Sequence, residues 1–110
     1  MDSQKATNVF ECTEENIKLC AKNILEGNVV VFPTETVYGM GACALNDSAV
    51  EKIYSYKKRP LNNPLIVHVI GWSEAEIYIN PTQNERDIAK RLVDVFWPGP
   101  LTILVRKNEF

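Results

Sequence analysis

The chain is 110 residues long, a length that allows one domain. Hydrophobic residues make up 45% of it and charged residues 24%, a globular composition that excludes an intrinsically disordered chain. Twelve lysines and arginines against fourteen aspartates and glutamates give a formal net charge of −2, which argues against a nucleic-acid-binding coat over the whole surface. Any cationic site must therefore be local.

The compartment and the metal content follow from a few residues. No apolar run is long enough to span a bilayer, and the polar amino terminus has no apolar signal core, so we expect neither membrane insertion nor export. The cysteines, Cys12, Cys20 and Cys43, form no Cys-x-x-Cys pair and predict reduced thiols in the cytoplasm. With His68 as the one histidine, we expect no metal site built from the chain's own side chains.

The first third of the chain predicts a helix, a strand and a loop. The helix begins after Thr13, whose side chain can cap it, and ends at Gly27. Residues 29–32, Val-Val-Val-Phe, predict a strand buried on both faces, and residues 33–41 predict a loop. The apolar face of the helix is expected to comprise Ile17, Cys20, Ala21, Ile24 and Leu25.

A second helix is expected from about Ser48, where Glu51 would complete a capping box, and it ends before Pro60. Residues 65–69, Leu-Ile-Val-His-Val, predict a second strand. His68 lies inside that strand. A lone histidine there is more often a core residue bonded to a neighbour than a catalyst, and spacing alone does not decide between the two.

The last third predicts two helices and a strand. A short helix is expected over 73–79, and Thr82 with Glu85 makes a capping box that opens a longer helix, ended by the prolines at 98–100. Residues 101–105 predict a third strand. The order αβαβααβ predicts an α/β (α+β) domain with a sheet of few strands. The apolar stripe of the longer helix is expected to be Ile88, Leu92, Val95 and Phe96.

Two segments could bind a ligand. The loop at 33–41 places Thr34 and Thr36 after a strand, where α/β proteins bind small molecules, although threonines also serve as turn caps. Lys57-Lys58-Arg59 could clamp a phosphate with the help of Asn63, although cations at a helix end also simply favour its dipole. No Walker or dinucleotide-binding glycine motif is present.

Three motifs together change this interpretation. Residues 27–41 (GNVVVFPTETVYGMG), 57–69 (KKRPLNNPLIVHV) and 96–102 (FWPGPLT) strongly resemble the Sua5/YrdC/YciO family, whose best-known members are threonylcarbamoyl-AMP synthases. The resemblance implies a YrdC-like twisted mixed sheet flanked by helices. It also implies a nucleotidyltransferase that makes threonylcarbamoyl-AMP and pyrophosphate from L-threonine, bicarbonate and ATP. Partner proteins then transfer the threonylcarbamoyl group to an adenosine of certain tRNAs.

The resemblance also assigns roles to individual residues. It implies that Thr36 and His68 contact the threonine substrate, with Thr34 in the same loop as a further candidate. Arg59 and Asn63 would bind ATP, and Lys57 would complete a Lys-x-Arg pattern at the phosphates. Lys57 and Arg59 would then act in catalysis by neutralising the charge that develops when a carbamate attacks the α-phosphate. A Mg²⁺ ion bridging the phosphates is expected as well.

Family members continue for about as much chain again, with a Ser-x-Asn motif and an arginine that complete both sites. We therefore expect residues 1–110 to be a truncated, amino-terminal part of a single domain, inactive alone, with residues 1–13 as a flexible lead-in. Uncovered sheet edges would favour a homodimer or strand exchange. The alternatives are a non-catalytic module that binds double-stranded RNA or tRNA, and a carbamoyl-transferring relative of hydrogenase-maturation proteins.

Overall fold

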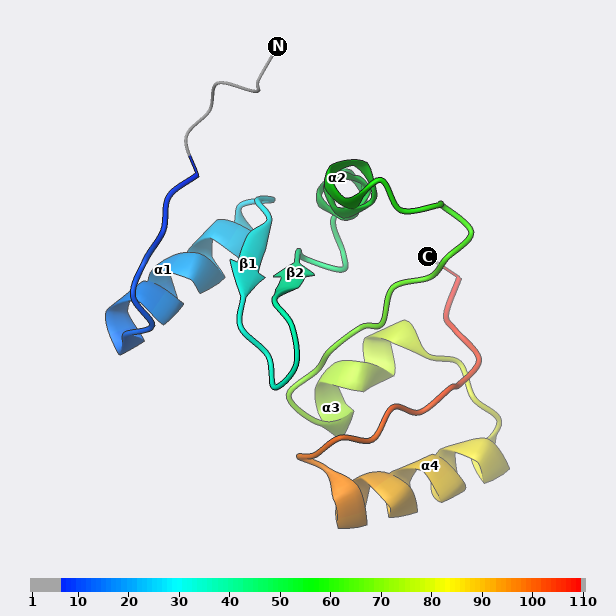
Figure 1. Cartoon of the computed structure of the whole chain (residues 1–110). Coiled ribbons are helices and arrows are strands. Elements are labelled where there is room, and N and C mark those ends of the chain that lie inside the picture. The colour runs from blue at the N-terminus through cyan, green and yellow to red at the C-terminus, as the bar shows by residue number, and fades with distance from the viewer. Residues whose placement is uncertain (1–6, 110) are drawn as a thin grey trace. The chain divides into compact units, whose positions relative to one another are not determined.

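The computed structural model describes residues 7–109, so residues 1–6 of the expected lead-in lie outside the described part. Residues 7–12 belong to no helix or strand. The chain divides into two compact units, one up to Leu65 and one from Ile66 onward. Figure 1 shows the elements of each unit in chain order. Within the described residues, no helix is long and apolar enough to cross a membrane.

Helix α1, Glu14–Leu25, begins as predicted. The Thr13 hydroxyl accepts the Asn16 N–H at 3.2 Å, and two glutamates occupy the first turn, where the helix dipole favours anions. None of the residues of its predicted apolar face is buried, and Ile17 and Leu25 are 58% and 79% exposed. Apolar periodicity fixes which side chains share a face, but burial also needs a packing partner for that face.

The segment predicted as a strand and a loop is a β-hairpin. Strand β1, Val30–Phe32, pairs antiparallel with β2, Gly39–Gly41 (Figure 1). The loop prediction for 33–41 is therefore wrong at its end, where the glycines form the second strand. Burial of the first strand on both faces is also wrong, since Val31 is 57% exposed. The glycines of β2 lie beneath the Phe32 ring: a Cβ at Gly41 would stand 2.9 Å from its Cε1.

Helix α2, Asp47–Lys57, begins close to the predicted start near Ser48, but with a cap two residues earlier. The cap is Asn46 rather than Ser48, because the Asn46 side chain accepts the N–H of Ala49 at 3.1 Å. Ala49 and Ile53, one turn apart, are the buried residues of this helix. Lys52 Nζ donates to the Gly27 carbonyl at 3.0 Å and ties α2 to the turn between α1 and β1.

The second unit begins its regular structure with α3, Trp72–Ala75, continued by a 3₁₀ turn, η1, Glu76–Tyr78 (Figure 1). The predicted short helix over 73–79 is thus confirmed to within a residue at each end. No side chain caps it. The Glu76 carboxylate instead accepts the Trp72 indole N–H at 2.8 Å and the guanidinium of Arg86 at 2.7 Å.

Helix α4, Gln83–Phe96, has the predicted capping box. The Thr82 hydroxyl accepts the Glu85 N–H, and the Glu85 carboxylate accepts the Thr82 N–H at 2.8 Å. The buried residues of α4 are Ala89 and Val93, neither of which belongs to the predicted stripe. The predicted stripe residues remain 39–73% exposed; they are Ile88, Leu92, Val95 and Phe96.

Residues 65–69 and 101–105 were predicted to be strands, and both predictions are wrong in the described structure. Besides the β1–β2 hairpin, the described residues contain an isolated antiparallel bridge between Ile79 and Lys107. A strand needs a second segment to exchange backbone hydrogen bonds, and no described segment pairs with either apolar run. The mixed α/β class is confirmed, with a described sheet limited to two antiparallel strands.

Candidate functional site

The hairpin turn distinguishes its two threonines. The Thr34 hydroxyl donates to the Val37 carbonyl and accepts the Thr36 N–H at 3.3 Å, so it organises the turn. Thr36 is exposed, and its hydroxyl has no hydrogen-bond partner within residues 7–109. The turn-cap interpretation therefore fits Thr34, while the Thr36 hydroxyl is available to a ligand.

The end of α2 brings the three cations into a Schellman turn. Lys58 adopts the left-handed conformation, with φ 51° and ψ 41°. Its N–H donates to the Ser55 carbonyl at 3.3 Å, and the Arg59 N–H donates to the Tyr54 carbonyl at 2.9 Å. Because the backbone reverses at Lys58, Lys57 is the last residue of the helix, and Arg59 begins the following loop.

The Arg59 guanidinium holds that loop. Its Nε donates to the Asn63 carbonyl at 3.1 Å, and Nη2 donates to the Pro64 carbonyl at 2.9 Å. A guanidinium carries five N–H donors, so these two bonds fix its plane and leave the remaining donors, including both on Nη1, for an anion. The side chains of Lys57 and Asn63 are exposed and have no partner in the described part of the chain. This turn is a fixed, cationic edge suited to phosphate oxygens.

His68 lies in the second unit and is exposed, so it is not a core histidine. Its Nδ1 is 3.2 Å from the Ile66 carbonyl, which can only accept, so Nδ1–H is the donor of this hydrogen bond, and Nε2 has no partner among the described residues. An open hollow of about 490 Å³ lies beside it, large enough for an amino-acid side chain. The hollow is lined by His68, Val69, Ile70, Glu74, Ile77 and Tyr78.

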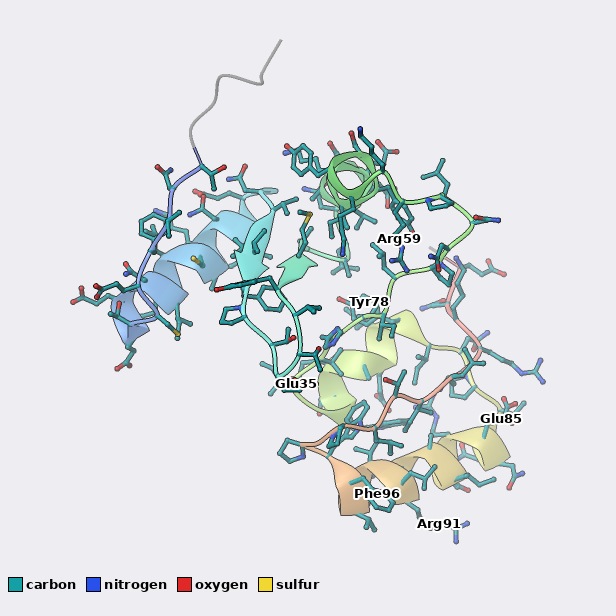
Figure 2. All side chains as sticks on the ribbon, viewed as in Figure 1. Glu35, Arg59, Tyr78, Glu85, Arg91 and Phe96 are labelled. Atoms are coloured by element: carbon teal, nitrogen blue, oxygen red, sulfur yellow. The ribbon has the colours of Figure 1, made fainter. Side chains whose placement is uncertain are left out.

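One carboxyl group titrates away from its ordinary range, and it lies outside the predicted site. The hydrogen bond from the Thr82 backbone N–H lowers the pKa of Glu85; loss of hydration opposes this, and the hydrogen bond and charge of the Arg106 guanidinium lower the pKa further. This reports on the start of α4 (Figure 2). Residues 7–109 contain no group of three or more histidine, cysteine, aspartate or glutamate side chains placed to hold a metal ion.

Comparison with known proteins decides the family. The family model for Sua5, YciO and YrdC proteins, described as "Telomere recombination", matches residues 22–110. The chain belongs to this family. Within it, the chain is 46% identical over 104 residues to a threonylcarbamoyl-AMP synthase of Pyrococcus abyssi, covering 93% of the chain and 29% of that protein. A threonylcarbamoyl-AMP synthase of Bacillus subtilis is 44% identical over 99 residues, covering 90% and 28%.

Solved structures of the family agree. A crystal structure of P. abyssi Sua5 complexed with L-threonine matches with a TM-score of 0.79 and 42% identity, over 91% of this chain and 28% of that one. A H234A/Y235A variant of P. abyssi Sua5 matches with a TM-score of 0.73 and 44% identity, over 88% and 29%. The chain thus spans less than a third of the length of these relatives.

Sequence reasoning missed the contribution of Tyr54 to the cationic turn and the backbone conformation of Lys58. Tyr54 counted only as an apolar position on a helix, yet its hydroxyl donates to the Asn63 carbonyl at 2.9 Å. Lys58 gave no sign of a left-handed turn, because glycine and asparagine are the residues that usually mark one. The signal that could have found Tyr54 is a phenol half-buried in the last turn before a polar loop, since such a hydroxyl usually finds a partner.

Proposed function

We propose that this chain is part of a threonylcarbamoyl-AMP synthase, and that it supplies the amino-terminal part of a single YrdC-like domain. The observation that carries the proposal is the turn after α2, where Arg59 is fixed by two carbonyls and still has N–H groups for an anion. The names of the P. abyssi and B. subtilis relatives support the reaction, and the P. abyssi protein has been crystallised as a complex with L-threonine.

In this proposal the hairpin and His68 bind threonine. The Thr36 hydroxyl bonds the substrate directly, and Thr34 holds the turn that presents it. His68 offers Nε2 as an acceptor from the substrate hydroxyl. The substrate amine adds to bicarbonate with loss of water, which gives a carbamate on the threonine nitrogen.

The cationic turn then assists transfer to the nucleotide. A carbamate oxygen attacks the α-phosphorus of ATP, the bond from that phosphorus to the bridging oxygen breaks, and pyrophosphate leaves with the electron pair. Lys57 and Arg59 bear on the phosphates and neutralise the developing charge, while the Asn63 amide donates to a phosphate oxygen. Magnesium would be bound chiefly by the phosphates and water, since the described residues hold no carboxylate cluster for it.

The remaining parts of the proposal concern the whole protein. It acts in the cytoplasm, and a threonylcarbamoyl-transferase complex passes the product to tRNA. The 110-residue chain alone is inactive, because it spans less than a third of the P. abyssi and B. subtilis relatives. Many apolar side chains are exposed within residues 7–109, which favours a homodimer or strand exchange when the chain is isolated.

The test is pyrophosphate release by the full-length protein, measured with ATP and with threonine and bicarbonate added or withheld. Release should require both, and the double variant Arg59→Ala with Thr36→Ala should abolish it. Activity that survives the double substitution would show that the site is misassigned. Salt-sensitive binding of tRNA without affinity for ATP would instead point to the RNA-binding module.

A further inference from the structure

The loop after α2 is held at a single carbonyl oxygen by two side chains. The Asn63 carbonyl accepts the Tyr54 hydroxyl at 2.9 Å and Arg59 Nε at 3.1 Å. A carbonyl has two acceptor sites, so both donors can bond it at once. The backbone N–H of Asn63 donates to the Pro60 carbonyl at 3.0 Å, which closes the loop on itself.

Tyr54 also fixes the start of the same loop, at Arg59. Its backbone carbonyl accepts the Arg59 N–H at 2.9 Å, as part of the Schellman turn. Tyr54 therefore fixes both the backbone of Arg59 and the Asn63 carbonyl oxygen that accepts from the Arg59 guanidinium.

We propose that Tyr54 is a positioning residue for the phosphate-binding turn, acting through Asn63 and Arg59 without touching the nucleotide. This inference rests on the proposed function, since it assumes that the turn binds the phosphates of ATP. A guanidinium that already stands in its binding geometry loses little freedom when the nucleotide arrives. Without the Tyr54 hydroxyl, the loop at 60–64 loses one of its anchors, and the Arg59 guanidinium must be ordered by the ligand.

A purely structural role for Tyr54 gives a different result. If its hydroxyl only stabilised the fold, its removal would lower the melting temperature and affect both substrates alike. If it positions the turn, the KM for ATP rises while the KM for threonine does not move. Removing only the hydroxyl keeps the ring, so the packing of α2 is retained.

The experiment compares Tyr54→Phe with Tyr56→Phe in the full-length protein. Tyr56 is on the same helix, is 64% exposed and makes no hydrogen bond in the described part of the chain, so it is the matched control. We expect Tyr54→Phe to raise the KM for ATP about three- to tenfold, the range of one hydrogen bond, with the KM for threonine unchanged. Tyr56→Phe should change neither. In an Arg59→Ala background, Tyr54→Phe should add no further loss of ATP affinity, measured by calorimetric titration.

Each other outcome is decisive. Equal KM values for ATP in the parent and Tyr54→Phe would overturn the inference and leave the proposed function standing. Equal rises in both substrate KM values, with a lower melting temperature, would assign Tyr54 to the fold alone and also overturn it. A parent protein with no affinity for ATP would overturn the proposed function itself, and this inference with it.

Discussion

Lys58 has a backbone conformation that is unfavourable for a residue with a Cβ atom. At φ 51° and ψ 41° it occupies the left-handed region, where an L residue with a Cβ is disfavoured by about 1–2 kcal/mol. Glycine at this position removes that strain, but its freedom in the unfolded chain costs about 0.5–1 kcal/mol. Lys58→Gly should therefore raise the free energy of unfolding by a net amount of about 0.5–1 kcal/mol.

The measurement is urea unfolding of the full-length protein, together with exchange of the amide hydrogens of residues 58 and 59. These amides donate to the Ser55 and Tyr54 carbonyls, so their protection reports the Schellman turn directly. In Lys58→Gly the protection should increase. The matched control is Lys57→Gly. Lys57 is the last residue of α2 and has helical backbone geometry, so this substitution should lower the free energy of unfolding by about 0.5–1 kcal/mol.

The reverse substitution is available at the end of α1. Gly27 is the left-handed residue of the corresponding turn, with φ 94°, and a Cβ there would stand 3.0 Å from Asn46 Nδ2. Gly27→Ala should therefore lower the free energy of unfolding by about 1–2 kcal/mol. If Lys58→Gly were as destabilising as Lys57→Gly, the left-handed strain at Lys58 would be refuted.

Three further predictions test other parts of the structure. Because the Thr82 backbone N–H lowers the pKa of Glu85, folding favours the ionised carboxylate, and this stabilisation is present above the ordinary pKa of 4.5 and is lost as the pH falls through the lowered pKa. Glu85→Gln should therefore flatten the acid side of a plot of melting temperature against pH. A plot identical to that of the parent protein would contradict this. Gly41→Ala should lower the free energy of unfolding, measured in urea, by about 1 kcal/mol or more, because the added Cβ displaces the Phe32 ring. In a Phe32→Ala background this loss should disappear, and additive losses would argue against the contact. Thr36→Ser should keep the KM for threonine and Thr36→Val should raise it several-fold, whereas equal values would remove the hydroxyl from the site.

The helices were the most predictable part of this fold. The capping box of Thr82 and Glu85 and the cap at Thr13 are local, so a few adjacent residues decide them. The cap of α2 was misplaced because Asn46 and Ser48 are both good caps, and only the backbone geometry selects one.

The strands were the least predictable part. The apolar runs at 65–69 and 101–105 indicate a preference for burial, but strand formation depends on a partner that the run itself does not encode. The hairpin was missed for the opposite reason, because Gly39 and Gly41 look like turn residues while their lack of a side chain makes room for the Phe32 ring.

The candidate site was predicted from the resemblance of three motifs to a family, and the chemistry of the residues alone did not single it out. A run of three cations predicts a solvated helix end as well as a phosphate clamp, and only the three motifs in order favoured the clamp. The fixation of Arg59 by two carbonyls, and the role of Tyr54 in it, depends on a turn that closes at a left-handed lysine. That conformation is not encoded by residue type, so the sequence could not reveal it.

The most direct test of the central claim is the affinity of the full-length protein for ATP, measured by calorimetric titration, in Lys57→Ala and Lys22→Ala. Both lysines lie in the last turn of a helix and are exposed, so they match in dipole and solvation, but only Lys57 adjoins the turn that holds Arg59. The account predicts about a tenfold weaker affinity for Lys57→Ala, as for loss of one charge-assisted hydrogen bond, and no change for Lys22→Ala. Equal affinities in the two variants would contradict it.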